Sequence, residues 1–249
     1  MKHLLIAWLC FFATLSTWAT PVSMVYDISA NRIVSQQGDN TQRPIASLTK
    51  LMTAMVVLDS KVPLGELVTI NRLKGTILPQ KDYSRLELLY AMLVKSDNSA
   101  AETLAENHPG GRSRFMATMN QRAREMGLTN TQFADPSGLS IFNISTLIEV
   151  GVMLQTANDY ELIRNISTQR EVRLVTNKKR SVNLLNTNHS ILTQFKDIVV
   201  SKTGFTNPAG FCIGMVLNRQ GHEFIVVVLG EKNKHQRTAT VNRIMKELS

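Results

Sequence analysis

The chain has 249 residues, of which 43% are hydrophobic and 19% are charged, and this balance is typical of a folded globular protein. It excludes a disordered chain, a collagen-like chain and a membrane protein with several spans. The 28 Lys and Arg residues outnumber the 19 Asp and Glu residues and give a net charge of +9. Such a basic chain favours an anionic partner, whether nucleic acid, a lipid headgroup or a cell-wall polymer.

The first nineteen residues have the pattern of a secretory signal peptide. Lys2 and His3 precede an apolar run over Leu4–Leu15, and Thr17-Trp18-Ala19 places small residues at the two positions that a signal peptidase reads. The apolar run is too short to span a bilayer comfortably, which disfavours a membrane anchor. We therefore expect cleavage after Ala19 and export of the remaining chain.

Export narrows the possible partners and the possible covalent links. Removal of nineteen residues leaves one domain over residues 20–249, with 230 residues and a net charge of +8. We expect no nucleic-acid partner for an exported chain. Cys10 is lost with the signal peptide, so Cys212 is the sole remaining cysteine and no disulfide forms within the mature chain.

The N-terminal two thirds of the mature chain is predicted to be mainly helical. Val22–Ile28 and Arg32–Ser35 are expected to form a hairpin. Pro44 precedes the segment Ala46–Leu58, which is apolar on nearly every face and is therefore predicted to be a buried helix. Further helices are expected at Arg85–Val94, Ser99–Glu106, Phe115–Met126 and Ser145–Ala157.

The C-terminal part changes to the pattern of strands. Ile198–Lys202, Phe211–Leu217 and Phe224–Leu229 are rich in β-branched or aromatic residues, and Asn218–Gly221 is predicted to turn between the last two. A closing helix is expected from Thr238 to Leu248. The order of elements predicts an α+β fold, with an antiparallel sheet built from both chain ends and a helical region inserted between them.

Ser47 and Lys50 lie one helical turn apart at the start of the buried helix, so their side chains share a face. Burial and the positive helix terminus both lower a lysine pKa, and a neutral Lys50 amine is able to accept the Ser47 proton. The same terminus offers backbone N–H groups to an oxyanion. The alternative interpretation is a capping serine beside a lysine that extends to solvent.

Two further short motifs occupy suitable places. Ser96-Asp97-Asn98 lies between two predicted helices, where the alternative role is a helix N-cap. Lys202-Thr203-Gly204 closes a predicted strand, and its small residues allow a ligand backbone to approach. Together with Ser47 and Lys50, in this order, they form the motif set of penicillin-binding proteins and class A β-lactamases.

The chain resembles the low-molecular-mass penicillin-binding proteins, which are serine D-alanyl-D-alanine peptidases. The matching segments are Pro44–Thr53 (PIASLTKLMT), Lys95–Ala101 (KSDNSAA) and Asn186–Asn188 (NTN). Ser201–Cys212 (SKTGFTNPAGFC) is most similar to the periplasmic endopeptidases of the penicillin-binding protein 7 type. The resemblance implies a transpeptidase fold like that of the β-lactamases. It also implies cleavage of D-Ala–diaminopimelate cross-links in peptidoglycan.

The resemblance also implies roles for individual residues. Ser47 is expected to be the nucleophile and Lys50 its general base. Ser96 is expected to relay a proton to the leaving amine, and Asn98 to hold the substrate amide. The substrate is the peptide stem of peptidoglycan, and β-lactams are expected to act as covalent inhibitors.

The sheet side of the site is implied in the same way. Lys202 is the expected electrostatic partner across the cleft, and the Thr203 hydroxyl is expected to contact the substrate carboxylate. The backbone N–H groups of Ser47 and Phe205 would form the oxyanion hole. Arg237 stands 35 residues after Lys202, where related enzymes carry an Arg that helps to bind the carboxylate; an ordinary basic surface residue is the alternative.

The sequence departs from the family pattern at two places. Many members add a β-domain and an amphipathic anchor, but twelve residues follow Arg237, which implies an enzyme without a membrane anchor after signal cleavage. Glu149 stands where many members have Asp, beyond the turn Asp135–Ser140 (DPSGLS), and we expect a structural role for it.

Three competing functions share some of these features. A carboxypeptidase that trims pentapeptides would use the same acyl-enzyme. A class A β-lactamase deacylates with a Glu-activated water. Glu161 and Asn165 have the spacing of that element, but Glu161 lies 63 residues after Asn98 and only 41 before Lys202. In β-lactamases the element lies nearer the second motif, so this position disfavours a β-lactamase. A non-catalytic penicillin-recognising module is disfavoured by the complete set of motifs.

Metal and cofactor chemistry is not expected. The five His residues are scattered, with no HExxH or HxH pattern, and no phosphate-binding glycine loop is present. Cys212 is interpreted as a small core side chain. Lys178-Lys179-Arg180 is interpreted as a solvated hairpin tip, with binding of an anionic glycan as the alternative.

Overall fold

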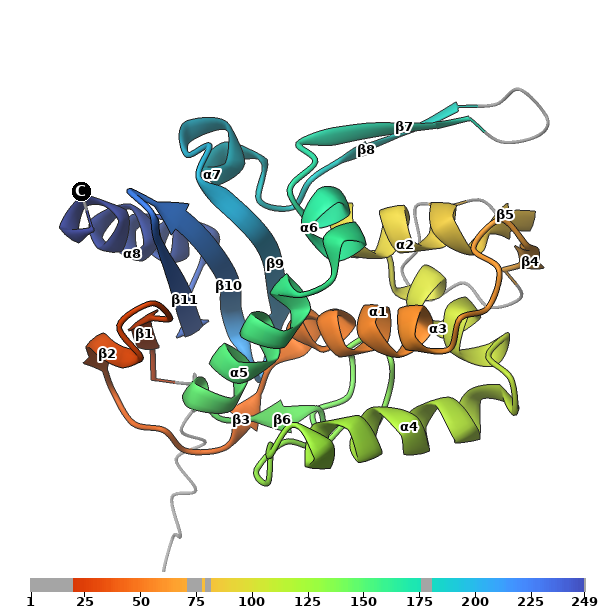
Figure 1. Ribbon diagram of the computed structural model, residues 1–249, viewed down its shortest axis with the longest axis horizontal. Coiled ribbons are helices and arrows are strands. Elements are labelled where there is room, and N and C mark those ends of the chain that lie inside the picture. The colour runs from red at the N-terminus through yellow and green to blue at the C-terminus, as the bar shows by residue number, and fades with distance from the viewer. Residues whose placement is uncertain (1–19, 71–77, 79–81, 176–180, 249) are drawn as a thin grey trace, which may run out of the picture.

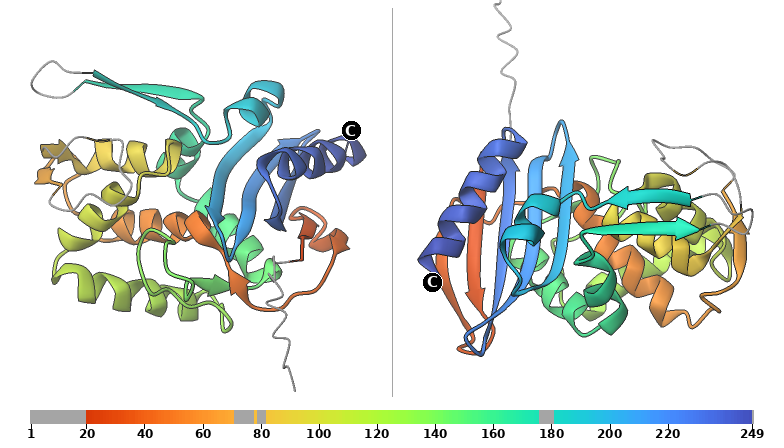
Figure 2. Two further views of the ribbon diagram at one scale, coloured as in Figure 1. Left: turned by 180° about the vertical axis from the view of Figure 1, so that it is seen from behind. Right: turned by 90° about the horizontal axis from the view of Figure 1, so that it is seen from above.

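A computed structural model describes residues 20–70, 78, 82–175 and 181–248 of the chain. The expected signal peptide and the basic segment Lys178–Arg180 lie outside the described residues. Within the described part, the element order is that of strands, helices, strands and a final helix. Figures 1 and 2 show a sheet with helices on both sides, and a larger helical region beside it.

The main sheet joins the two ends of the chain, as the sequence predicts. Its order is β2-β1-β11-β10-β9, all antiparallel, so that β1 (Val22–Asp27) lies between β2 (Arg32–Gln37) and β11 (His222–Glu231). In this register Val22 faces Leu229. The strands β10 (Gly210–Arg219) and β9 (Ile198–Thr206) complete the sheet, and β9 is its edge.

The two faces of the sheet bury separate hydrophobic clusters. Along β11, Val226 and Val228 pack with residues of α8 (Lys234–Glu247), whereas Val227 and Leu229 belong to the larger core on the other face. This alternation follows from the two-residue period of a strand. In Figure 2, α8 covers one face while α5 (Leu147–Asn158) and the helical region lie on the other.

The helical region surrounds α1 (Thr49–Asp59), nearly all of whose residues are buried. Its neighbours begin with side-chain caps: Ser84 forms a capping box at the start of α2, and Asp97 accepts a hydrogen bond from the Ala100 N–H at the start of α3. The Asp97 cap also fixes the loop between the two helices. The remaining bounds are α2 (Arg85–Val94), α3 (Asn98–Glu106), α4 (Gly111–Glu125), α6 (Glu161–Ser167) and α7 (His189–Gln194).

Several helix starts differ from the sequence predictions. α3 begins one residue and α4 four residues earlier than predicted, and three other starts have a local explanation. The expected helix from Ala46 begins as a 3-10 turn, η1 (Ala46–Leu48), and continues as α1. α5 begins at Leu147 because Thr146 caps it: the Thr146 hydroxyl accepts a hydrogen bond from the Glu149 N–H. α8 begins four residues earlier than predicted because Asn233 caps it, and this places Arg237 in its first turn.

Three short antiparallel strand pairs lie outside the main sheet. β3 (Arg43–Pro44) pairs with β6 (Ile144–Ser145), and β4 (Leu67–Thr69) pairs with β5 (Asp82–Ser84). β7 (Glu171–Val175) pairs with β8 (Ser181–Leu185), on either side of the predicted basic tip. Figure 1 shows this last pair extending over α2.

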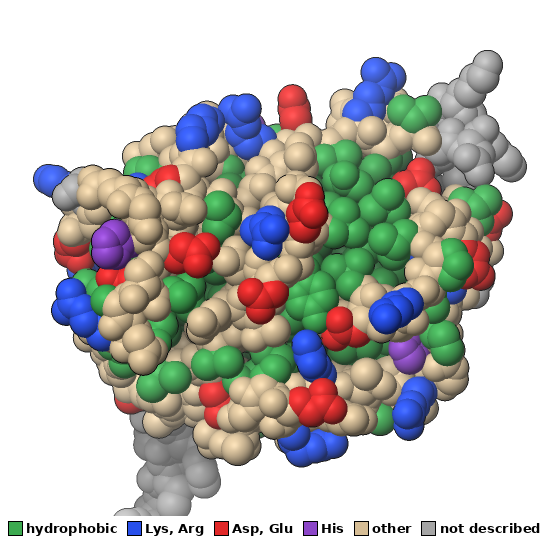
Figure 3. Space-filling model, in the orientation of Figure 1, with side chains coloured by type: hydrophobic (Ala, Val, Ile, Leu, Met, Phe, Trp, Pro, Cys, Tyr) green, Lys and Arg blue, Asp and Glu red, His purple; other side chains and the backbone are tan. Residues whose placement is uncertain are grey.

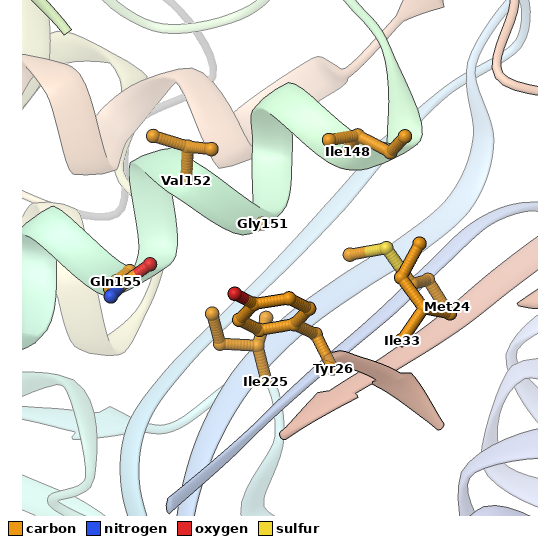
Figure 4. Close-up of a pocket in the computed structure, with 8 residues that line it drawn as sticks. All are labelled: Met24, Tyr26, Ile33, Ile148, Gly151, Val152, Gln155 and Ile225. Atoms are coloured by element: carbon orange, nitrogen blue, oxygen red, sulfur yellow. The ribbon is translucent and has the colours of Figure 1, made fainter. Parts of the chain in front are cut away.

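An apolar pocket lies between α5 and the sheet (Figure 4). Met24 and Tyr26 of β1 and Ile225 of β11 face Gly151 of α5 across it. A Cβ at Gly151 would come within 2.8 Å of the Met24 methyl carbon, so glycine allows this close approach of helix and sheet. The pocket holds no Lys, Arg, Asp, Glu or His, and it is therefore a packing feature rather than a place for acid–base chemistry.

On the face seen in Figure 3, basic and acidic side chains are interspersed, and hydrophobic side chains gather below the β7–β8 pair. The net positive charge is thus not collected into one patch on this face. No helix in the described part of the chain is both long and apolar enough to cross a membrane.

Candidate active site

The three sequence motifs meet in one cleft beside the exposed edge of the sheet. Ser47 comes from η1, Ser96 and Asn98 from the α2–α3 junction, and Thr203 from β9. The cleft has a volume of about 460 Å³. Its lining residues are Ser47, Lys95, Ser96, Asn98, Leu139, Leu185, Asn186, Thr187, Thr203, Gly204, Phe205, Phe211, Lys234 and Arg237.

Ser47 is held in a tight backbone arrangement. Ala46, just before it, has a φ of 47°, in the left-handed region that a non-glycine residue rarely adopts. Two glycines press against this turn: a Cβ at Gly138 would lie 2.0 Å from the Ala46 carbonyl oxygen, and a Cβ at Gly204 would lie 3.0 Å from the Ser47 nitrogen. Gly138 therefore cannot be replaced without moving this turn, and Gly204 leaves little room beside it.

Lys50 is fully buried directly behind Ser47. Its Nζ atom donates to Ser47 Oγ at 2.8 Å, to Asn98 Oδ1 at 2.7 Å and to the Ser137 carbonyl oxygen at 2.5 Å. Burial lowers the pKa of Lys50 to about 7, although three nearby carboxylates favour the charged form, those of Asp135, Asp97 and Glu102. At neutral pH a large share of this amine is therefore unprotonated and within reach of the Ser47 proton.

The α2–α3 junction presents the next two groups. Ser96 has a φ of 64°, a strained conformation for a serine, and its Oγ accepts a hydrogen bond from Lys202 Nζ at 3.0 Å. Asn98 lines the cleft and its Oδ1 atom accepts from Lys50 Nζ, so its amide nitrogen is the group able to donate a further hydrogen bond. Asp97, between them, is turned away from the cleft and caps α3.

Lys202 is a second buried lysine, across the cleft from Lys50. Besides Ser96, its Nζ atom donates to the Thr203 carbonyl oxygen at 2.9 Å. Burial holds the pKa of Lys202 well below its usual value, and the positive charges of Lys50 and Arg237 act in the same direction. Thr203 Oγ1 lies 2.6 Å from Thr187 Oγ1, which ties the strand to the preceding segment.

Arg237 lies at the far end of the same wall. Its guanidinium is 5% exposed, lines the cleft and donates to the Cys212 carbonyl oxygen at 3.4 Å. Beside it, the rings of Phe205 and Phe211 pack with centroids 4.1 Å apart, and the Phe205 side chain is exposed. All nine predicted site residues therefore gather in or around one cleft.

The structure adds a partner that the motifs did not identify, the Ser137 carbonyl oxygen on Lys50. A turn around Asp135 brings it there, and the segment Asp135–Ser140 was the signal in the sequence. Thr187 is a second addition, from the segment Asn186–Asn188. Both contacts join segments far apart in the chain, which no local pattern specifies.

Other residues singled out in the sequence lie outside the cleft lining. Glu161 and Asn165 are exposed on α6. Glu149 accepts hydrogen bonds from the backbone and side chain of Asn130 and from the Thr131 hydroxyl, a structural role. Cys212 is buried on β10, and burial raises the pKa of its thiol to about 11.

The fold is that of the penicillin-binding DD-peptidases. It matches penicillin-binding protein D2 from Listeria monocytogenes in its ampicillin-bound form, with a TM-score of 0.82, 27% identity, and coverage of 90% of this chain and 95% of that one. The DD-transpeptidase of Streptomyces K15 shares the fold, with a TM-score of 0.81, 24% identity, and coverage of 90% of this chain and 94% of that one.

The sequence comparisons define the family. The model of the peptidase family S11, described as D-alanyl-D-alanine carboxypeptidase, matches residues 13–233. The chain is 34% identical to a D-alanyl-D-alanine endopeptidase of Escherichia coli K12, covering 91% of this chain and 76% of the relative. It is 35% identical to one from Pseudomonas aeruginosa PAO1, covering 89% and 75%. The chain belongs to this family of serine DD-peptidases.

Proposed function

We propose that the chain is a periplasmic endopeptidase that cleaves D-Ala–diaminopimelate cross-links of peptidoglycan through an acyl-enzyme on Ser47. The observation that carries the proposed chemistry is the 2.8 Å contact between Ser47 Oγ and the buried Lys50 Nζ at the cleft. A serine is a weak nucleophile unless a neighbouring base accepts its proton. A lysine with a pKa near 7 is such a base.

In the first step, Ser47 Oγ attacks the carbonyl carbon of the D-Ala that is joined to diaminopimelate, and the Ser47 proton passes to Lys50 Nζ. The carbonyl π electrons move to oxygen, and the backbone N–H groups of Ser47 and Phe205 bind this oxyanion. The free Nδ2 group of Asn98 holds the substrate amide, because its Oδ1 atom is already bound by Lys50.

In the second step, the carbon–nitrogen bond breaks and the leaving amine takes a proton relayed by Ser96. Lys202 donates to Ser96 Oγ and favours this role by orienting the hydroxyl. The D-Ala ester of Ser47 remains. Water then attacks the ester, and proton transfer through Lys50 releases the peptide and restores Ser47.

The sheet wall is proposed to bind a carboxylate of the leaving group. The carbon attached to the leaving nitrogen carries a carboxylate both in a terminal D-Ala and in the diaminopimelate of a cross-link. Lys202, the Thr203 hydroxyl and Arg237 are the groups placed for it. Arg237 is largely buried and donates to one carbonyl at 3.4 Å, so its remaining N–H groups are suited to an anion.

The choice of an endopeptidase rests on the relatives and on the region beyond the carboxylate. The two relatives at 34% and 35% identity are D-alanyl-D-alanine endopeptidases. A cross-link continues past the scissile bond, and the exposed Phe205 and Lys234 offer an open path for it. The predicted signal peptide supports a periplasmic location.

The same site is proposed to react with β-lactams, as the ampicillin-bound Listeria relative does. Their strained amide occupies the position of the D-Ala peptide bond and opens onto Ser47. Glu161 is exposed on α6 and is not part of the cleft lining, so it is not placed to activate a deacylating water. We therefore expect the β-lactam ester to persist.

A D-alanyl-D-alanine carboxypeptidase is the second candidate function. The family description favours it, as does a Bacillus subtilis carboxypeptidase that is 24% identical over 90% of this chain and 60% of its own length. The two functions share the acylation step and differ in the leaving group.

The test is to incubate the purified enzyme with cross-linked muropeptide dimers and with pentapeptide monomers in parallel, and to measure the products by chromatography. We expect dimers to be cut to monomers faster than D-Ala is released from pentapeptides. Equal or inverted rates would overturn the endopeptidase proposal and leave the serine mechanism in place. Loss of both activities in the Ser47→Ala variant is the control for contaminating peptidases.

A further inference from the structure

Asp135 is a buried carboxylate behind the cleft, 8% exposed, and it organises a turn. Its Oδ1 atom accepts from the backbone and hydroxyl of Ser137, both at 2.7 Å, and from the N–H groups of Gly138 and Leu139 at 2.6 and 3.3 Å. Its Oδ2 atom accepts from the Ser140 N–H at 2.5 Å. Burial raises the pKa of Asp135, but the hydrogen bonds outweigh it and keep the pKa below the ordinary value.

This turn reaches the reacting groups through its backbone. The Ser137 carbonyl oxygen accepts from Lys50 Nζ at 2.5 Å and from Ser47 Oγ at 3.4 Å. Gly138, the next residue, has a φ of 85° and presses against the Ala46 carbonyl. The position of the Ser137 carbonyl is therefore set by the hydrogen bonds that the Asp135 carboxylate receives on both sides of it.

The turn is also fixed from behind. Asn143 is fully buried, and its Nδ2 atom donates to the Asp135 carbonyl at 2.8 Å and to Thr49 Oγ1 of α1 at 3.0 Å. Its Oδ1 atom accepts from the N–H groups of Ala134 and Asp135. Asp135 is thus attached to the helix that carries Lys50, which leaves the turn little freedom relative to the amine.

We propose that Asp135 is a positioning residue for the general base: through the Ser137 carbonyl, it fixes Lys50 Nζ beside Ser47. The inference rests on the proposed function of Lys50. Asp135 itself lines no part of the cleft and acts through its neighbours. The Ser137 carbonyl that Asp135 holds is an acceptor for Lys50 whether or not substrate is bound. The Lys50 amine therefore keeps its position as it gains and loses a proton.

The effect of Asp135 on Lys50 can be distinguished from the effects of the other charged groups around Lys50. Asp97 and Glu102, on the α3 side, also favour its charged form, and Lys202 on β9 faces it as a positive charge. Glu102 is bound by Arg112 at 2.9 Å, and Asp97 caps α3. Of the three carboxylates, Asp135 has the largest influence and lies in the turn that contacts the amine.

The experiment compares Asp135→Asn with the wild-type enzyme, and measures the rate of acylation by a fluorescent penicillin from about pH 5 to about pH 9. The substitution removes the negative charge of Asp135, which favours the protonated amine, so Lys50 becomes a free base at lower pH. We expect the midpoint of the rising rate to move down by about one pH unit. We also expect the plateau to fall about tenfold, because the amine is less well placed.

Glu149→Gln is the matched control. Glu149 is also 8% exposed and also accepts backbone hydrogen bonds, but its partners are Asn130 and Thr131. We expect a lower melting temperature in this variant and an unchanged midpoint. A midpoint in Asp135→Asn that equals the wild-type value, or that moves equally in Glu149→Gln, would overturn the proposal.

Ser137→Ala is the second variant if Asp135→Asn does not fold. It removes one hydrogen bond to Asp135 and keeps the carboxylate charge and the backbone carbonyl. We expect the midpoint to stay and the plateau to fall about two- to fivefold; an unchanged plateau would reject the positioning role. Labelling of the wild type, and its absence in Ser47→Ala, reports on the proposed function independently of all these midpoints.

Discussion

The cleft has two walls, and each contains a fully buried lysine in a different electrostatic setting. On the helical wall, Lys50 is surrounded by three carboxylates that partly offset the effect of burial on its pKa. On the sheet wall, Lys202 is influenced by burial and by two further positive charges, which all lower its pKa. Within the described residues, the acceptors of Lys202 are a hydroxyl and a carbonyl, and that of Arg237 is a carbonyl.

The difference assigns the two walls to different tasks. The helical wall supplies enough negative charge to keep the Lys50 pKa near 7, where an amine both accepts and returns a proton. Among the described residues, no carboxylate pairs with Lys202 or Arg237, so we expect an anionic ligand to supply the opposite charge. We expect a bound substrate carboxylate to raise the pKa of Lys202 and to be held there by it.

Removing the Ser47 hydroxyl tests the helical wall most severely. The hydroxyl is the one atom that forms the acyl bond, so Ser47→Ala should reduce penicillin labelling by at least about 10⁴-fold. Its loss leaves the buried core unchanged, and the melting temperature should stay close to that of the wild type. Fluorescent gel labelling and thermal unfolding measure the two effects; labelling that persists would refute the assignment.

The pH dependence tests the state of Lys50. Its pKa is lowered to about 7, and the base must be unprotonated, so acylation is slow below this pH and rises through it to a plateau. We expect about a 100-fold increase between about pH 5 and about pH 8, measured as the second-order rate of penicillin acylation. A rate that is flat over this range would contradict a neutral lysine base.

Arg237→Leu tests the sheet wall and should have the smallest effect of the three. The substitution removes a largely buried positive charge and leaves Ser47 and Lys50 unchanged. It should therefore weaken the binding of substrates that carry the leaving-group carboxylate. We expect kcat/KM to fall about 10- to 100-fold for such a peptide, and much less for the same peptide as its C-terminal amide. An equal loss for both peptides would indicate a structural role.

Much of this arrangement was predictable from the sequence because it depends on short spacings. Ser47 and Lys50 share a helix face. Ser96 and Asn98 lie where one predicted helix ends and the next begins, and Asp97 between them is a typical N-cap residue. The strands at both chain ends carry clear hydrophobic patterns. These local rules predicted the α+β class and an antiparallel sheet built from both chain ends, and the resemblance to a known family supplied the roles of the site residues.

The remaining features depend on contacts between distant segments. The left-handed conformation of Ala46 fits because glycines stand at positions 138 and 204, which pack against it. The residues next to Ala46 in the sequence do not predict this conformation. The Ser137 carbonyl reaches Lys50 across 87 positions of the chain. Every residue has a backbone carbonyl, so no sequence pattern identifies the Ser137 carbonyl as a partner of Lys50.

The pairing of β1 with β11 has a consequence for the order of folding. Val22 and Leu229 face each other, although about 200 residues separate them, so the central strands of the sheet close one of the longest loops the chain allows. The sheet, and with it the wall that carries Lys202, therefore assembles after the C-terminal strands become available. A chain with this topology leaves β1 without its partner strand β11 until nearly all of the chain is available, which exposes it to aggregation until the two strands pair.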